Sequence, residues 1–518
     1  MEIGNSKKQE IGRSEVEMLS MDRVREMGIP KDKDKNYILM ILTAILASTV
    51  FVLLFSYSTS PIYYEYYGED SAQFLLIGKA WSVGRLPYRD MFDHKGPFIF
   101  FVDMIGFLLT PNSTIGVMLL QIVSWSITLI AVFNISNLFT RKVSVNCLFA
   151  ISTIICAKMN YAKGDEVEEF CLPFIAISTF GILSFFLQNK EKDYHNPVWG
   201  SIYGVTFAIC LMTRLTNAIT ICPGILFIAI LLIFNRQFKN LAYNVICFLI
   251  GMTLMLSPFV LYFAIKGCLS EALFCTLTFN VDYAITKTAW INNLNVFSFF
   301  YYTEHYFLSW SILIAGLIAF GRKDYITMSL YIFTGICETI LFCAGDMYPQ
   351  YPMVCLIQVP ILLGEGYSAK GDTILLEKLY RGISYVAVFI FCCYGLSEGI
   401  PEAIKSYRDC ANDRYVAGEE FLKLIPESDR SEIVCYGPDR SKEIYLRNNI
   451  FPCYKYFIVQ NWHGSFSEDV KSDIIDTFAS GEAKWIIATE DTSLIDDTLH
   501  SKYDCVESNG TDRLYRRK

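Results

Sequence analysis

The stretch YILMILTAILASTVFVLLFS, from Tyr37 to Ser56, decides the fold class of this chain. It carries no charge, and at about 1.5 Å of helical rise per residue it is long enough to cross the roughly 30 Å hydrocarbon core of a bilayer. The preceding segment 1–37 holds eight basic and eight acidic side chains, too many acids for the start of a cleaved signal peptide. We therefore predict a cytoplasmic arm over 1–37, followed by a membrane-spanning helix.

Further apolar segments predict a polytopic membrane protein with about eleven spanning helices. They lie at about 113–134, 143–158, 169–188, 198–214, 216–235, 241–265, 297–320, 325–344, 349–365 and 380–398. The composition agrees, because only 19% of the residues are charged, against about 25% in soluble domains. The sequence has no cluster of basic residues of the kind that binds nucleic acid, so no nucleic-acid partner is predicted.

The charges of the short loops predict the orientation of the chain in the membrane. On the side of the N-terminus these loops hold eleven basic residues, namely Arg141, Lys142, Lys190, Lys192, Arg236, Lys239, Arg322, Lys323, Lys370, Lys378 and Arg381. The opposite loops hold four: Lys158, Lys163, Arg214 and Lys266. This asymmetry predicts a plasma-membrane protein with its N-terminus in the cytoplasm and, after an odd number of spans, its C-terminal part outside.

The segment 399–518 is predicted to be an extracytoplasmic α/β domain, beyond a membrane domain over 38–398. A helical stretch is expected between Pro401 and Pro426, and strands at 432–436 and 484–489. The segment 467–481 predicts a helix that Ser467 begins and Gly481 ends, with one apolar face made of Val470, Ile474 and Phe478. The segment has no GxGxxG pattern, so we assign it no nucleotide.

The first external loop, about 57–112, concentrates the ionisable and aromatic residues. Asp70 precedes a stretch with apolar residues at helical spacing, namely Phe74, Ile77, Gly78 and Trp81, and Gly84 ends it. This pattern predicts an amphipathic helix that lies in the membrane interface. A second polar cluster follows within seven residues and consists of Arg89, Asp90, Asp93, His94 and Lys95.

Two carboxylate groups beside cations at a bilayer surface suit glycosyl transfer from a lipid-phosphate sugar. The acceptor hydroxyl needs a base, which a carboxylate supplies. The departing phosphate needs cationic donors such as Lys and Arg. A donor with a lipid tail needs a site at the membrane surface, which is where this loop is predicted to lie.

The residues Asp70-Ser71-Ala72, Gly84 to Asp90 and Phe92 to Pro97 resemble the first external loop of bacterial GT-C glycosyltransferases. These are the family-39-like relatives of protein O-mannosyltransferase and of the lipid A aminoarabinose transferase. Two weaker likenesses are the acidic run 164–170 before the fourth span and Tyr348-Pro349-Gln350-Tyr351 before Pro360. The resemblance covers about 35–400. It implies a polytopic, inverting enzyme that takes a sugar from a polyprenyl-phosphate donor on the external face, but it implies neither the sugar nor the acceptor. For the acceptor we predict a component of the cell envelope.

The resemblance also implies roles for individual residues. Asp70 takes the place of the catalytic carboxylate, and Asp93 and His94 belong to the second cluster, where they orient the acceptor, the donor or a metal. Lys95, with Arg89 or Arg214, is expected to bind the donor phosphate. The residues expected to support the acceptor are Asp90, Glu168 and Glu169. No cofactor is implied with certainty, although Asp93 and His94 are also a possible divalent-metal pair.

Each of these residues also has a purely structural interpretation. Asp70 is placed to cap the helix that follows it, and Lys95 and Arg89 are placed to face lipid headgroups. Arg214 is placed to extend toward the interface, and carboxylates at 168 and 169 are favourable at any helix start. Two other functions remain open for the whole chain: a lipid or glycan transporter or flippase, and a non-catalytic partner in surface-polysaccharide assembly.

Overall fold

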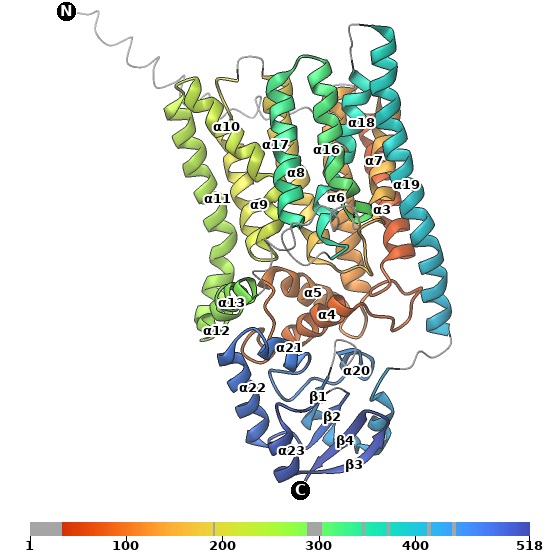
Figure 1. Ribbon diagram of the computed structural model, residues 1–518, viewed down its shortest axis with the longest axis vertical. Helices are drawn as coiled ribbons and strands as arrows, with labels where there is room; N and C mark the ends of the chain where they lie inside the picture. The colour runs from red at the N-terminus through yellow and green to blue at the C-terminus, as the bar shows by residue number, and fades with distance from the viewer. Residues whose placement is uncertain are drawn as a thin grey trace, which may run out of the picture.

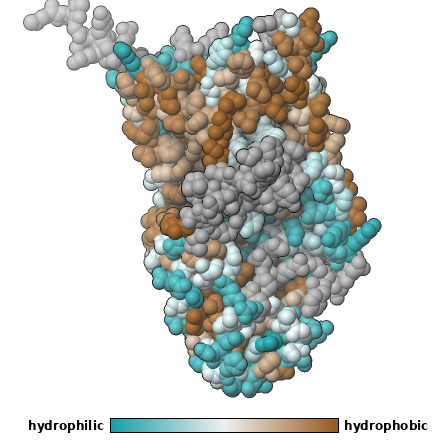
Figure 2. Space-filling model, in the orientation of Figure 1, coloured by the Kyte–Doolittle hydropathy of each residue, from teal (hydrophilic) through white to brown (hydrophobic). Residues whose placement is uncertain are grey.

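The structure is a computed structural model that describes residues 34–189, 192–286, 303–343, 348–369, 373–411, 416–437, 442–489 and 491–518. The predicted cytoplasmic arm therefore lies almost entirely outside the described residues. A bundle of helices forms the upper part of the molecule in Figure 1, and a smaller α/β domain forms the lower part. The surface of the bundle is predominantly hydrophobic in Figure 2, whereas the lower part is largely hydrophilic.

Each of the eleven segments that the sequence predicts as spans contains a helix. In the described residues, six helices are long and apolar enough to cross a membrane. They are α3 (Asp34–Phe55), α6 (Ile115–Phe139), α8 (Val167–Gln188), α11 (Phe238–Ile265), α17 (Tyr325–Cys343) and α19 (Ile374–Ala411). The other segments form α7 (Val143–Ala157), α9 (Pro197–Leu211), α10 (Cys222–Phe234), α16 (Thr303–Gly321) and α18 (Gln358–Ser368). The prediction of a polytopic helical protein is confirmed.

Two predicted spans begin with a tight 3₁₀ segment instead of an α-helix. The span at 216–235 is divided into η2 (Leu215–Thr220) and α10, and the span at 349–365 into η4 (Tyr351–Ile357) and α18. Pro223 and Pro352 lie in the first turns of α10 and η4, where a missing N–H costs nothing. Both breaks lie near the first loop, so they supply irregular backbone beside it.

The prediction that Pro401 opens a separate helix was wrong. Pro401 lies inside α19, which continues without interruption to Ala411. A proline removes one backbone hydrogen bond, but the helix is held on either side. The carboxylate of Glu402 pairs with Lys158 at 2.9 Å and accepts a hydrogen bond from Tyr57 at 3.4 Å. These contacts fasten α19 to the end of α7 and to the start of the first loop.

The first loop folds into two short helices that lie between the bundle and the α/β domain (Figure 1). They are α4 (Glu69–Ser82) and α5 (Pro97–Leu109). Gly78 permits their close crossing, because a Cβ at this position would lie 2.2 Å from the Cβ of Asp103. The helix predicted from Phe74, Ile77 and Trp81 therefore exists, and its apolar side chains are buried against α5.

A single buried carboxylate joins the first loop to two long helices. Glu169, in the first turn of α8, accepts hydrogen bonds from Gln121 at 2.8 Å and Trp125 at 2.6 Å, both on α6. It also accepts from Tyr161 at 3.0 Å and from the backbone N–H of Asp165 at 3.0 Å. Gln121 in turn accepts from the hydroxyls at the beginning of the loop, Ser56 and Thr59. Glu169 is thus fully used as a structural acceptor.

The C-terminal domain contains a four-stranded mixed sheet in the order β1-β2-β4-β3. The strands are β1 (Ile433–Tyr436), β2 (Trp485–Ala488), β3 (Tyr503–Asn509) and β4 (Asp512–Arg517). β1 and β2 are parallel, while β4 is antiparallel to both β2 and β3. The predicted helix is α22 (Glu468–Ser480), with Ser467 before it, Gly481 after it, and Val470, Ile474 and Phe478 buried. The remaining helices are α20 (Lys442–Arg447), α21 (Gln460–Gly464) and α23 (Asp496–Lys502).

The C-terminal domain and the first loop share backbone and side-chain hydrogen bonds. The N–H of Phe92 donates to the carbonyl of Lys455 at 2.9 Å, and Arg85 donates to the carbonyl of Pro452 at 2.5 Å. Helix α20 packs on α4. The loop is consequently held by the bundle on one side and by this domain on the other.

The orientation predicted from loop charge can be tested with a native cysteine. Cys505 is exposed on β3 of the C-terminal domain, so a membrane-impermeant maleimide should label it in intact cells. A cysteine introduced at the exposed Lys239 position (Lys239→Cys) should react only after permeabilisation. Cys505→Ser is the control that identifies the labelled thiol. Labelling of Cys505 only after permeabilisation would reverse the orientation.

Candidate functional site

A pocket of about 460 Å³ lies where the first loop, the bundle and the C-terminal domain meet. Four of the predicted site residues line it: Asp70, Asp93, His94 and Lys95. The loop before α8 contributes Lys163 and Glu166. Gln350, directly before η4, and Tyr351, its first residue, also line the pocket. Val459, Trp462 and His463 close it from the C-terminal domain. The pocket thus combines carboxyl groups, ammonium groups and aromatic rings.

Asp70 lies in the first turn of α4, and it is not the residue that caps this helix. The N-cap position belongs to Gly68, and α4 begins at Glu69. The interpretation of Asp70 as a cap is therefore wrong. One carboxylate oxygen, Oδ2, accepts a hydrogen bond of 3.4 Å from the Gln350 amide. Negative charge in a first turn is favoured by the helix dipole.

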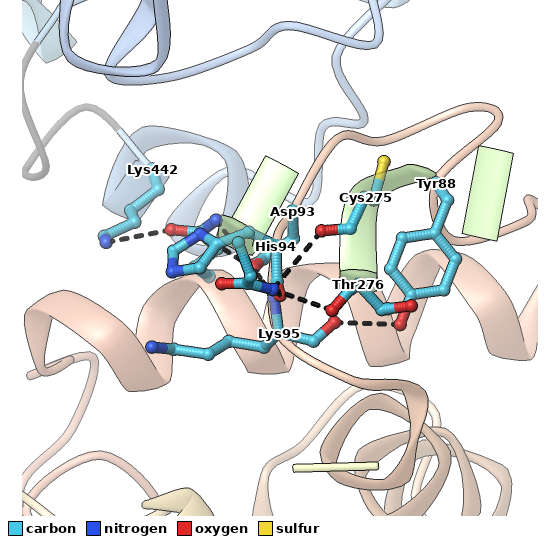
Figure 3. Close-up of polar contacts among 9 residues, drawn as sticks. Tyr88, Asp93, His94, Lys95, Cys275, Thr276 and Lys442 are labelled. Carbon is cyan, nitrogen blue, oxygen red and sulfur yellow. Dashed lines mark hydrogen bonds and ion pairs between the residues drawn. The ribbon is translucent and has the colours of Figure 1, made fainter. Parts of the chain in front are cut away.

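Asp93 is buried and is held by a chain of hydrogen bonds that reaches the C-terminal domain. Its Oδ1 accepts from the backbone N–H of Lys95 at 2.8 Å, and its Oδ2 accepts from the Gln73 amide at 2.5 Å. The amide oxygen of Gln73 accepts from the Lys442 ammonium at 3.4 Å. Figure 3 shows Lys442 reaching toward the loop from α20. The order ammonium, amide, carboxylate fixes the orientation of the Gln73 amide.

Burial sets the protonation of Asp93 and His94. The pKa of Asp93 is raised to about 6, because burial outweighs the opposing effects of the Lys95 N–H and of the Lys95 and Lys442 charges. The pKa of His94 lies well below its ordinary value, because burial and then the positive charge of Lys95 disfavour the imidazolium. His94 is therefore neutral at physiological pH, whereas Asp93 is mostly ionised.

The ring of His94 lies among aromatic side chains from two parts of the chain. Its centroid is 6.1 Å from that of Tyr283 on α13 (Phe279–Thr286) and 5.6 Å from that of Trp462 on α21. The backbone is fixed as well, since Asn280 donates to the His94 carbonyl at 2.8 Å (Figure 3). His94 thus connects the polar floor of the pocket to an aromatic wall.

Lys95 is positioned by its backbone, which leaves its side chain to the pocket. Its carbonyl accepts from the Tyr88 hydroxyl at 2.9 Å. Among the described residues, no carboxylate lies within ion-pairing distance of its ammonium group. The next residue, Gly96, lies directly against the end of α9, where a Cβ would come within 2.1 Å of the Met212 carbonyl oxygen. The glycine therefore lets the loop pack against the bundle and sets the position of Lys95.

Glu166 is a pocket residue that our sequence reasoning did not select. It is buried, and its pKa is raised well above the ordinary value by burial and then by the negative charge of Asp70. A carboxyl group with such a pKa keeps its proton near neutral pH and can donate a hydrogen bond. The acidic run 164–170 contained this signal, but the neighbouring Glu168 and Glu169 were chosen instead.

The other predicted residues lie outside the pocket lining. Arg89 is 48% exposed and pairs with Asp90 at 2.7 Å, while Asp90 also accepts from the backbone N–H of Leu86 at 2.7 Å, which closes a turn. Arg214 pairs with Glu168 at 3.3 Å and lies over the Tyr351 ring, 2.9 Å from its centroid.

Tyr351 lines the pocket, and Arg214 packs on the Tyr351 ring without belonging to the lining itself. Glu169 is the structural acceptor described above.

The possible divalent-metal site does not fit the geometry of Asp93 and His94. Both oxygens of Asp93 already accept hydrogen bonds, and His94 Nδ1 lies 3.7 Å from Asp93 Oδ1. In the part of the chain that the structure describes, no group of three or more His, Cys, Asp or Glu side chains is arranged to hold a metal ion.

The residues that the C-terminal domain contributes were also missed. Sequence patterns placed 399–518 in a separate domain, but they did not indicate which of its residues contact the first loop. Trp462, His463 and Lys442 meet α4 and the 92–95 segment only through tertiary packing. The aromatic and basic residues of the segment 455–463 were the only local signal.

Comparison with solved structures identifies the fold. ArnT from Cupriavidus metallidurans, solved bound to undecaprenyl phosphate, matches with a TM-score of 0.55 at 13% identity, over 92% of this chain and 97% of that chain. The oligosaccharyltransferase AglB from Archaeoglobus fulgidus, solved with an inhibitory peptide and a dolichol-phosphate, gives a TM-score of 0.44 at 11% identity, over 88% and 70% of the two chains. The likeness to ArnT shows that this chain has the GT-C fold, which confirms the resemblance read from the first loop.

No curated protein matches the sequence. A family model described as the putative competence-induced protein Ccs4 N-terminal domain matches residues 31–367, which include the bundle up to α18 and the first loop. On this match, the chain belongs to the family of the putative competence-induced protein Ccs4 N-terminal domain.

Proposed function

We propose that this protein is a membrane glycosyltransferase that moves a sugar from a polyprenyl-phosphate donor to an acceptor of the cell envelope on the extracytoplasmic face. The observation that carries the proposal is the pocket in which the Asp70 carboxylate and the Lys95 ammonium both lie, beside the interfacial helices α4 and α5. The solved structure of ArnT, which holds undecaprenyl phosphate, has the same fold and supports a lipid-phosphate donor.

In this proposal, Asp70 is the general base. An acceptor hydroxyl attacks the anomeric carbon of the donor sugar, the bond from that carbon to the phosphate oxygen breaks, and the hydroxyl proton passes to Asp70. Attack opposite the departing phosphate inverts the anomeric configuration. Gln350 holds Oδ2 of Asp70, and in the described part of the chain Oδ1 has no hydrogen-bond partner. The second oxygen is therefore available to accept the proton.

Lys95 binds the donor phosphate. As the glycosidic bond breaks, negative charge grows on the phosphate, and an ammonium group already in place stabilises that charge without reorganising. Lys163 lies in the same lining and adds positive charge. Arg214 lies behind Tyr351 and is committed to Glu168, so its contribution to phosphate binding is indirect. Arg89, paired with Asp90 outside the lining, has no part in the proposed mechanism.

Asp93 and His94 position the reactants. Asp93 fixes the backbone of Lys95 and connects it through Gln73 to Lys442. Neutral His94 offers one ring nitrogen as a donor and one as an acceptor to a substrate hydroxyl. Glu166 lines the same pocket, and burial together with the negative charge of Asp70 raises its pKa, so it keeps its proton. Its O–H can therefore donate a hydrogen bond to a substrate oxygen.

The test of the base is Asp70→Asn. Asn has almost the same shape but cannot take up the proton, so transfer should fall by roughly 100-fold or more. Asp70→Glu keeps the carboxylate about one methylene away from its place and should lose less activity. The measurement is release of polyprenyl phosphate from lipid-linked sugars by purified protein in lipid nanodiscs.

Asp476→Asn, at an exposed position of α22, is the matched control and should behave as the parent does. An Asp70→Asn protein within a few-fold of the parent at equal thermal stability would exclude Asp70 as the base. Polyprenyl-phosphate release by none of the proteins would favour a transporter or a non-catalytic assembly partner.

Lys95→Ala should weaken donor binding and slow turnover while leaving expression intact, because the side chain lines an open pocket and its removal leaves no core cavity. Lys95→Arg should recover only part of the activity, since a planar guanidinium does not replace a compact ammonium. Donor affinity is measured by titrating polyprenyl phosphate against the protein. Lys471→Ala, which removes a lysine of the C-terminal domain, is the control. Equal affinities in the parent, the Lys95→Ala protein and the Lys471→Ala protein would contradict the assignment.

Asp93 should produce an acid limb in the pH profile near its pKa of about 6. Below this pH the carboxyl gains a proton and one of its two hydrogen bonds is lost, so activity should fall as pH decreases. Because this pKa is above the ordinary 3.8, ionisation of Asp93 costs folding stability as pH rises toward 6. Activity and the Asp93 contribution to stability thus change with pH in opposite directions. In Asp93→Asn the limb near pH 6 should disappear; a persistent limb would assign it to another group.

A further inference from the structure

The outer wall of the pocket is an aromatic surface supplied mostly by the C-terminal domain. Trp462 is its centre, with ring centroids 5.7 Å from Tyr283 and 4.8 Å from Phe466. His463 lies beside it, 5.2 Å between centroids, and is buried against Phe92. Trp462 remains only partly buried and lines the pocket, so part of its indole is available to a ligand.

The backbone holds Trp462 in place at a cost in strain. Val459, directly before α21, has a φ of 43°, a left-handed conformation that a β-branched residue rarely adopts. Such strain persists only where the surroundings enforce it, and it occurs preferentially at functional sites. Here the Val459 N–H donates to the Gly437 carbonyl at 2.8 Å.

Gln460 and Asn461, which lie between Val459 and Trp462 in the chain, are anchored to the sheet. Gln460 donates to the Cys435 carbonyl of β1 at 2.8 Å. Asn461 donates to the Asp491 carbonyl at 2.7 Å and accepts from the Tyr436 hydroxyl at 2.5 Å. The side chains of Gln460 and Asn461 therefore turn toward the domain interior. Their hydrogen bonds hold the backbone of α21 in place, and Trp462 faces the pocket from it.

The chemistry of this wall fits a sugar ring. One face of a pyranose is made of C–H groups and packs against an aromatic face, while its hydroxyls each donate and accept hydrogen bonds. Beside Trp462 the pocket offers neutral His94, protonated Glu166 and the Gln350 amide, all of which are suited to hydroxyl groups. An acyl chain would need an aliphatic groove. Among the described residues that the C-terminal domain contributes to the lining, only Val459 is aliphatic.

We infer that Trp462 is the stacking platform for a sugar of the acceptor, and that the acceptor is a glycan whose hydroxyl is thereby presented to Asp70. This inference rests on the proposed glycosyltransferase function and adds to it the chemical class of the acceptor. It also gives the C-terminal domain a direct role in acceptor binding. Lys442 is the second contribution of this domain, a positioning residue that reaches Asp93 through Gln73.

The experiment compares Trp462→Phe with Trp462→Leu. Both replacements are apolar and similar in bulk, but only Phe has a flat aromatic face. The acceptor is surface glycan extracted from a strain that lacks the protein, and membranes of the same strain supply the lipid-linked sugar. Sugar incorporated into glycan is measured against glycan concentration. Trp462→Leu should raise KM for the glycan roughly tenfold, whereas Trp462→Phe should stay within about threefold of the parent and kcat should change little.

Two further measurements separate the possible outcomes. The affinity for polyprenyl phosphate should be the same in the parent and both variants, which also shows that they are folded. Tyr407→Ala removes an aromatic side chain that is 57% exposed on α19, away from the pocket lining, and should leave the glycan KM unchanged.

Equal KM values for the Phe and Leu variants, or incorporation of sugar into the protein or lipid fraction and not into glycan, would overturn the inference while leaving the glycosyltransferase proposal intact. Failure of the parent to transfer sugar to any fraction, with no polyprenyl phosphate released, would instead refute the proposed function and the inference with it.

Discussion

The carboxylate of Glu169 is the contact on which the rest of the site depends. It receives four hydrogen bonds, from α6, from Tyr161 and from the backbone before α8. Through Gln121 it also determines where the first loop leaves the membrane. A buried carboxylate is costly unless each of its oxygens is satisfied. Because all the donors converge on Glu169, α6, α8 and the loop have one compatible arrangement, and that arrangement sets the positions of Asp70 and Glu166.

Much of the fold could be predicted because membrane burial imposes simple rules on a sequence. A helix is required wherever about twenty apolar residues follow one another, and every segment predicted in this way contains one. The helix at 468–480 was predicted from its terminal residues and its apolar face. Pro401 was misread because the rule that proline interrupts a helix ignores tertiary support, here the contacts of Glu402 with Lys158 and Tyr57.

The site was predictable in part because four of its residues come from one loop. Asp70, Asp93, His94 and Lys95 are close in sequence and were found together in the pocket lining. Glu166, Trp462 and Lys442 come from distant segments, and no periodicity or spacing relates them to the first loop. Glu169 was selected by its charge, but its role follows from the donors that surround it, which a sequence does not show. Site residues that lie in one loop could therefore be predicted together, whereas those contributed by distant segments could not.

The bond between the Phe92 N–H and the Lys455 carbonyl has a consequence for how the molecule is made. A chain is synthesised from its N-terminus, and its first part can fold while the remainder is still on the ribosome. The loop with Asp70 and Lys95 is produced early, but its supporting partner is among the last segments to appear. The pocket thus acquires its final shape only after α19 has inserted and the C-terminal domain has folded. An incomplete chain therefore lacks the wall that Val459, Trp462 and His463 form, so the complete pocket appears only late in the synthesis of the chain.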